Sequence, residues 1–272
     1  MDFKSFNECE YIIEGIDIDV IKHTVSFNAK HENSIDTSTL LNPTCMMMGE
    51  IPVYSIFKRK RTKSKSYDGN PLIYALKGID GWTFKNGTND ILNLLNQFIT
   101  ITKKIKTDYD TLITVPSSNK LNNMFLHRLN RIIKCENEIT DHFYKLECED
   151  VLLNYVDWKS IERDGLNSDD VLSELELFFD EMEEKNNGIF SYKYFKNMEL
   201  RKYITKTMKN YDDSIIKYAN MINDKDIVVL DDTISTTSTI SETCKLLIDT
   251  YTPKSITVIT LFSKLDEKPN NK

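Results

Sequence analysis

The stretch IVVLDDTISTTSTI, from Ile227 to Ile240, is the part of the chain from which the fold is interpreted. Four apolar residues lead into the adjacent carboxylates of Asp231 and Asp232, and every residue from 233 to 239 except Ile234 is Ser or Thr. The apolar run predicts a buried strand, and the hydroxyl-rich run predicts the loop after it. In an open parallel sheet, ligands bind beyond the carboxyl ends of the strands, so both carboxylates fall where a ligand is expected.

The segments after this stretch complete a strand–helix–strand unit. ISETCKLLIDTY predicts a helix, and ITVITLF at 256–262 predicts a second buried strand. One face of the helix collects its apolar residues, which are Ile240, Cys244, Leu247 and Tyr251. A strand, a helix and a strand in this order imply a parallel pair with a right-handed crossover. Strands that are apolar on both faces favour an α/β fold, with a parallel sheet flanked by helices.

A similar pattern occurs upstream. TLITV at 111–115 predicts a buried strand that Pro116 ends, SSN predicts a turn, and the following residues predict a helix. The helix has apolar residues at helical spacing: Leu121, Phe125, Leu129 and Ile132. Before it, TNDILNLLNQFITITKKIK predicts another amphipathic helix.

The chain divides into three parts in this interpretation. Residues 1–69 form a β-rich N-terminal region or hood, 70–265 form the α/β domain, and 266–272 form a disordered tail. The basic run at 58–71 is either a solvated hairpin tip or a mobile phosphate-binding arm. A helical insertion at about 150–210 contains an acidic helix, which Asn167 or Ser168 caps.

Composition excludes several classes of protein. The net charge of −7 argues against a general nucleic-acid binder. The five cysteines are scattered and odd in number, which favours a reduced, cytoplasmic compartment and argues against a structural zinc site. No signal peptide and no membrane-spanning apolar run is present, and neither a GxGxxG nor a P-loop motif occurs.

Carboxylates beside a hydroxyl-rich loop suit a ligand with two kinds of group. Carboxylates accept hydrogen bonds from vicinal sugar hydroxyls, whereas hydroxyls and the N–H groups of a following helix bind phosphate. A ribose 5-phosphate carries both groups, so it fits the stretch around Asp231 and Asp232.

VVLDDTISTTSTI resembles the phosphoribosyl-pyrophosphate (PRPP) loop of type I phosphoribosyltransferases. The resemblance implies that Asp231 and Asp232 are the catalytic, ribose-binding acids. It also implies that the 5-phosphate is held by Ser235, Thr236, Thr237, Ser238 and Thr239. Thr237 departs from the pattern, because the family usually has glycine there. A β-branched residue with positive φ costs about 1–2 kcal/mol, so the loop either turns differently or binds phosphate more weakly.

The upstream segments are similar in order to the ComF-like branch of this family, although its second proline and its Arg-Gly pair are missing. On that resemblance, VPSSN is the pyrophosphate-binding turn. The implied pyrophosphate contacts are Ser117, Ser118, Asn119, Lys77, Arg128 and Arg201, with Arg131 as a further candidate. The alternative for the helical cations is an ordinary solvated charge. The basic segment 193–206, which includes Lys196, Arg201 and Lys202, is either a lid over the pyrophosphate or an exposed basic helix.

The resemblance implies a PRPP-dependent phosphoribosyltransferase of nucleotide metabolism, which transfers ribose 5-phosphate to an unidentified acceptor and releases pyrophosphate. Mg2+ is the implied cofactor, held through PRPP and by Asp231 and Asp232. The implied partners are PRPP, a small-molecule or base acceptor, and a second copy of the chain or another protein.

Three other interpretations stay open at this point. The first is a non-catalytic sensor of PRPP or a nucleotide, which Thr237 favours. The second is a haloacid-dehalogenase-type phosphatase, to which VVLDDT is loosely similar, although Thr233 stands where its second Asp is needed. The third is an interaction or effector module of a mobile-element or defence system, which the unmatched insertion permits.

Overall fold

The computed structural model describes most of the chain as two compact units. It describes residues 16–19, 21–27, 35–36, 42–59, 70–78, 80–105, 108–116, 121–192, 195, 197, 199–234 and 238–263. The sheet unit comprises residues 1–139, 221–237 and 253–272. The helical unit comprises residues 140–220 and 238–252.

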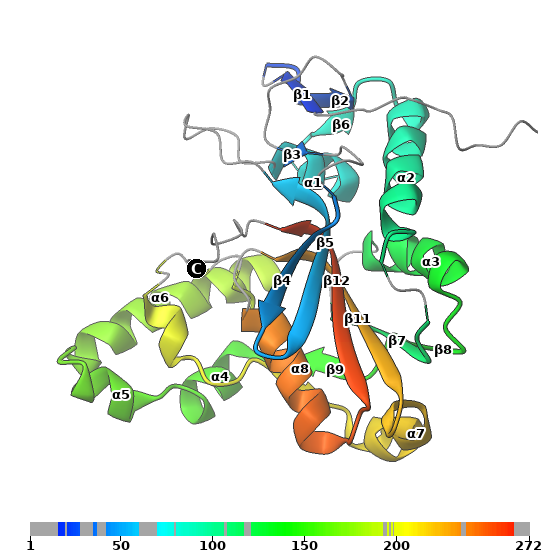
Figure 1. The fold of residues 1–272 in the computed structure, drawn as a ribbon. Helices are drawn as coiled ribbons and strands as arrows, with labels where there is room; N and C mark the ends of the chain where they lie inside the picture. Colours follow the sequence, from blue (N-terminus) through cyan, green and yellow to red (C-terminus); the bar gives the residue numbers. More distant parts are fainter. Residues whose placement is uncertain are drawn as a thin grey trace, which may run out of the picture. The chain divides into compact units, whose positions relative to one another are not determined.

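A seven-stranded, mostly parallel sheet forms the centre of the sheet unit (Figure 1). The strand order is β3-β5-β12-β11-β7-β8, with β4 also paired to β5. The mutually parallel strands are β5 (Ile51–Arg59), β7 (Thr111–Thr114), β8 (Asn137–Ile139), β11 (Asp226–Ile234) and β12 (Ser255–Ser263). β3 (Ile35–Asp36) and β4 (Thr44–Met48) run antiparallel to β5. The predicted α/β fold and the parallel pairing of the two C-terminal strands are therefore confirmed.

The apolar runs of the sequence became strands that are buried on both faces. Residues 227–230 of β11 have no exposed surface, and neither have Val258 and Ile259 of β12. Continuous apolar strands of this kind are stable only where both faces of the sheet are covered. This is why residues 227–230 lie at the centre of the sheet and not at its edge.

Three helices belong to the sheet unit: α1 (Asn70–Lys77), α2 (Thr88–Thr102) and α3 (Leu121–Ile133). Their apolar faces share one core with β11 and β12, as the periodicity predicts for α2 and α3. Phe98 of α2 meets Phe125 of α3 edge to face, with ring centroids 4.9 Å apart. In the first turn of α2, the buried Asp90 accepts hydrogen bonds from the backbone and side chain of Asn86. A carboxylate there also suits the positive end of the helix dipole.

A second, small sheet accounts for part of the predicted N-terminal β region. β1 (Ile16–Asp19) pairs antiparallel with β2 (Thr24–Phe27), and β2 pairs parallel with β6 (Thr83–Phe84). Three further strands of the predicted region 1–69, namely β3, β4 and β5, belong to the large sheet.

The helical unit has its own core. Its elements are β9 (Phe143–Lys145), α4 (Cys148–Asn154), α5 (Trp158–Arg163), α6 (Ser168–Asn186), the 3-10 helix η2 (Leu200–Tyr203), β10 (Met208–Asn210), most of α7 (Asp212–Ile222), and α8 (Ser238–Thr250). The buried residues of α6 pack with Phe190 and Phe195. Asn167 caps α6 by accepting a hydrogen bond from the Asp169 N–H, as predicted. The predicted insertion at 150–210 lies within this unit, which begins earlier and also includes α8.

Of the remaining predictions on organisation, the tail at 266–272 and most of the basic run at 58–71 lie outside the described residues. Within the described part of the chain, no helix is both long enough and apolar enough to cross a bilayer.

Candidate functional site

The carboxyl ends of β7 and β11 lie side by side where the chain connections diverge. β7 leads through α3 to β8, on one side of it, whereas β11 leads through α8 to β12, on its other side. The Val115 N–H donates to the Leu230 carbonyl over 3.0 Å, so the pairing with β11 extends one residue beyond the end of β7. In open α/β sheets this switch in direction marks the place where ligands bind. The segments predicted to contact pyrophosphate and ribose therefore follow neighbouring strands at the switch point.

Asp231 and Asp232 are residues of β11 itself, because the strand continues to Ile234. Each of the two residues is only 8% exposed. Successive side chains of a strand point to opposite faces of the sheet, so the two carboxylates do not share one face. Asp232 lies on the face of Val228 and Leu230, which is the face of the core that α1, α2 and α3 share.

Lys77 reaches the carboxylate of Asp232. The Lys77 Nζ lies 2.6 Å from the Asp232 Oδ2, and the two side chains are only 16% and 11% exposed. A charge-assisted contact of this length, partly shielded from water, is stronger than a surface ion pair. The structure thus brings together a predicted ribose-binding acid and a predicted pyrophosphate contact.

The way α1 ends explains the position of Lys77. Pro71 lies in the first turn of the helix, where its missing N–H costs nothing, and Gly78 follows the last helical residue with φ of +63°. A residue in this left-handed conformation commonly ends a helix, and glycine adopts it without strain. Lys77 is therefore at the negative end of the helix dipole, which favours a cation.

Asp231 lies in a row of polar side chains on the opposite face. Its register partner on β12 is Thr260, whose partner on β5 is Ser55. The hydroxyls of Thr260 and Ser55 are 3.1 Å apart, and both residues are buried. The Asp231 Oδ1 also accepts a hydrogen bond of 2.8 Å from the Asp232 N–H. Ser55 and Thr260 did not appear among the predicted site residues, although each interrupts an apolar strand pattern.

Thr233 lies two residues after Asp231 in β11, and its buried Oγ1 has no hydrogen-bond partner among the described residues. Thr233 shares the face of Asp231, because strand side chains alternate. This hydroxyl is one polar group at the carboxyl end of β11 that a ligand or water has to satisfy.

Six of the predicted phosphate contacts lie outside the described residues. These are Ser117, Ser118 and Asn119 after β7, and Ser235, Thr236 and Thr237 after β11. Ser238 and Thr239 are half-buried and begin α8 in the helical unit. The Thr239 carbonyl accepts a hydrogen bond from the Thr243 hydroxyl, one turn further along α8.

Arg128 is half-buried on α3, and Arg131 is exposed in the last turn of that helix. Arg201 lies in the helical unit, where its guanidinium donates to the carbonyls of Tyr192 and Phe195 at 2.8 and 2.6 Å. Burial lowers the pKa of the Arg201 guanidinium. Through these contacts, Arg201 of η2 holds the carbonyls of two residues that precede η2 in the chain.

Lys202, another cation of the predicted lid, is described, whereas two others are not. The Lys202 ammonium lies 2.7 Å from a carboxylate oxygen of Asp164, within the helical unit. Lys193 and Lys196 lie outside the described residues.

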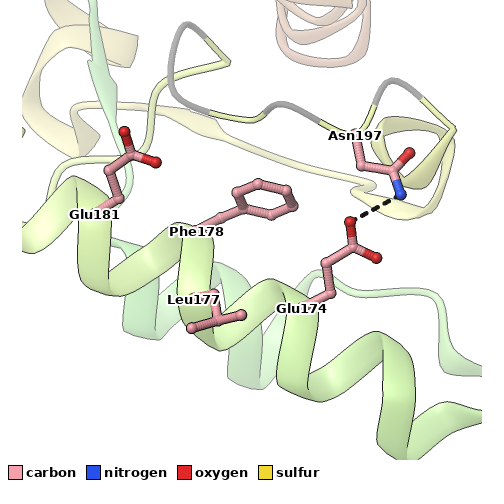
Figure 2. Close-up of a pocket in the computed structure, with 5 residues that line it drawn as sticks. All are labelled: Glu174, Leu177, Phe178, Glu181 and Asn197. Atoms are coloured by element: carbon pink, nitrogen blue, oxygen red, sulfur yellow. Dashed lines mark hydrogen bonds between the residues drawn. The ribbon is translucent and has the colours of Figure 1, made fainter.

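A groove of about 520 Å³ runs along α6 (Figure 2). Its described lining residues are Glu174, Leu177, Phe178, Glu181 and Asn197, and the Asn197 amide donates to Glu174 over 2.9 Å. These side chains carry negative or no charge, which disfavours a phosphate. A phosphorylated ligand is therefore expected at the sheet and not in this groove.

No protein-family model, curated protein or solved structure matches this chain. Among the described residues, no three His, Cys, Asp or Glu side chains cluster as metal ligands.

Proposed function

We propose that the chain binds PRPP at the carboxyl ends of β7 and β11 and transfers its 5-phosphoribosyl group to an acceptor. The observation that carries this proposal is the Lys77–Asp232 pair, largely shielded from water, at the topological switch point of the sheet. A cation and carboxylates at one strand end match a ligand that has both an anionic pyrophosphate and a sugar diol.

Each part of PRPP has a group that suits it. The carboxylates at 231 and 232 accept hydrogen bonds from the ribose hydroxyls, and the Lys77 ammonium faces the pyrophosphate. The segment that follows β11 supplies hydroxyls for the 5-phosphate. The type I phosphoribosyltransferase-like fold is proposed together with this assignment.

In the reaction, the bond between the anomeric carbon and pyrophosphate breaks, and a bond to the acceptor forms. Positive charge develops on the ribose, and negative charge develops on the leaving group. The carboxylates of Asp231 and Asp232 stabilise the positive charge on the ribose, and the Lys77 ammonium stabilises the negative charge on the leaving pyrophosphate. These interactions are strong because the site is shielded from water.

Mg2+ fits this donor set, since it prefers hard oxygen ligands and keeps several waters. Asp231 or Asp232, which lie on opposite faces of β11, would hold it together with the PRPP oxygens, and when bound it would neutralise charge on the leaving pyrophosphate.

A second candidate function is a sensor that binds PRPP or a nucleotide without turnover. One observation favours it: Thr237 replaces the glycine usual in the PRPP loop. Binding without pyrophosphate release in the presence of mixed purine and pyrimidine bases would identify the sensor.

The decisive experiment is calorimetric titration with Mg-PRPP of wild type and of the variant Asp231→Asn/Asp232→Asn. We expect the variant to lose at least about tenfold in affinity, since each lost charge-assisted hydrogen bond costs about 1.5–3 kcal/mol. Asp226→Asn, at the opposite end of β11, is the matched control and should bind like wild type. Thermal unfolding of each variant confirms that it is folded. Equal affinity of wild type and the double variant would exclude this site.

A further inference from the structure

We propose that the Lys77–Asp232 pair is exchangeable, so that the ligand separates it and each side chain then binds a different part of the ligand. The ribose hydroxyls take the Asp232 carboxylate, and the Lys77 ammonium moves to the pyrophosphate. This inference rests on the proposed function and adds that Lys77 competes with the sugar before it assists the leaving group.

The geometry gives the pair its strength. With 2.6 Å between Nζ and Oδ2, the ammonium occupies a hydrogen-bonding position on the carboxylate that a hydroxyl would otherwise take. Both side chains are largely shielded, so their attraction is weakened less by water than that of an exposed pair. A ligand that only offers a diol therefore has to replace a stronger partner of Asp232 with a weaker one.

The position of Lys77 permits the exchange. It is the last residue of α1, so its side chain can change direction without disturbing a further helical turn. Its ammonium is carried on a flexible stem of four carbons. The exchange needs only a change of side-chain rotamer, and α1 keeps its apolar contacts in the core.

PRPP offers a new partner to both Lys77 and Asp232, whereas each half of PRPP offers a partner to only one of them. Ribose 5-phosphate supplies hydroxyls for Asp232 but no pyrophosphate for Lys77, whereas pyrophosphate supplies an acceptor for Lys77 but nothing for Asp232. Only the complete substrate compensates both members of the pair, which makes binding of the two halves interdependent.

The first test uses the two halves as probes in titrations of the full chain. Lys77→Met removes the competitor of the sugar, so ribose 5-phosphate should bind about three- to tenfold tighter and pyrophosphate at least about tenfold weaker. Asp232→Asn should have the opposite effects, so that ribose 5-phosphate binds more weakly and pyrophosphate binds more tightly. Lys254→Met is the matched control, because Lys254 pairs with Asp226 over 2.8 Å at the amino end of the same strand. It should change neither affinity.

The second test uses the wild-type chain and does not depend on the folding of a variant. Lysine labelling with acetic anhydride, followed by mass spectrometry, compares Lys77 with the more exposed Lys254, whose side chain is 67% exposed. Without ligand, Lys77 should label more slowly than Lys254. Ribose 5-phosphate should raise Lys77 labelling at least about twofold, and pyrophosphate should lower it, while Lys254 stays constant.

The outcomes separate this inference from the proposed function. If wild type binds PRPP but both substitutions weaken both probes, or neither probe alters Lys77 labelling, the exchange is overturned and the proposed function stands. If wild type binds none of the three ligands, both are overturned.

Discussion

At the scale of single residues, neighbouring positions of one strand have different surroundings. Asp232 meets the Lys77 ammonium, whereas Asp231 lies in a row with Thr260 and Ser55 on the other face. The sequence presents the two aspartates as one motif, but the alternation of a strand separates their roles. The variant Asp231→Asn/Asp232→Asn therefore removes two distinct contacts, which the single variants Asp231→Asn and Asp232→Asn separate.

A buried histidine is expected to make the stability of the chain depend on pH. The His142 ring has no exposed surface, packs against Phe143, Tyr218 and Tyr251, and places its Nδ1 2.7 Å from the Ser214 hydroxyl. Its Nε2 has no hydrogen-bond partner among the described residues. Burial lowers the pKa of His142 from 6.5 to about 4, since the neutral ring is favoured in the folded state.

As the pH falls from 6.5 to 4, the unfolded chain binds the proton on His142 first, so the free energy of unfolding falls. We expect a loss of about 1–3 kcal/mol across this range, and none of this loss above it. Urea titrations at several pH values measure it. His142→Asn should flatten the dependence, because it removes the group whose pKa burial lowers. An unchanged slope in His142→Asn would contradict the assignment.

At the scale of elements, α8 and the segment of β10 are joined by one carboxylate. Glu242 of α8 accepts hydrogen bonds from the Thr207 N–H, the Thr207 hydroxyl and the Met208 N–H. Periodicity predicts the apolar face of α8, and burial of Ile240, Cys244 and Leu247 confirms it. It does not predict Glu242, because its partners lie more than thirty positions away.

Glu242→Ala should lower the free energy of unfolding by about 2–4 kcal/mol, because two backbone N–H groups lose a charged acceptor. Glu176→Ala, at an exposed position of α6, should change it by less than about 0.5 kcal/mol. Denaturant titrations followed by far-ultraviolet circular dichroism measure both. Equal stability of the two variants would show that the Glu242 contacts do not contribute.

At the scale of the whole molecule, the chain passes between its two units four times, after residues 139, 220, 237 and 252. Neither unit is a continuous segment, and α8 of the helical unit connects β11 and β12 of the sheet unit. Loss of structure in one unit removes the constraint on chain ends in the other. We therefore expect the units to unfold together.

Buried thiols test this expectation, with Cys135 in the sheet unit and Cys148 and Cys244 in the helical unit. Burial raises the pKa of each thiol to about 12, so the native chain should label only slowly there. The exposed Cys45 should label at once. In increasing urea, the three buried thiols should become reactive at one midpoint, read by mass spectrometry. Separate midpoints for Cys135 and the other two would show independent unfolding.

The sequence by itself determined the elements and the class of fold. The buried strands β7, β11 and β12, the faces of α2, α3 and α8, and the Asn167 cap all follow from residues that are close in sequence. Hydrophobic periodicity and capping are local properties, so one chain suffices to predict them. The adjacency of Asp231 and Asp232 to a strand end was also readable, although β11 continues beyond them.

Only the tertiary structure decided which distant residues meet. The order β5-β12-β11-β7 places Thr260 and Ser55 beside Asp231, and the packing of α1 brings Lys77 to Asp232. In the structure, β5 belongs to the main sheet, and Arg201 contacts the Tyr192 carbonyl within the helical unit. Such contacts depend on strand order and on the packing of the core, which many residues fix together, so no local pattern encodes them.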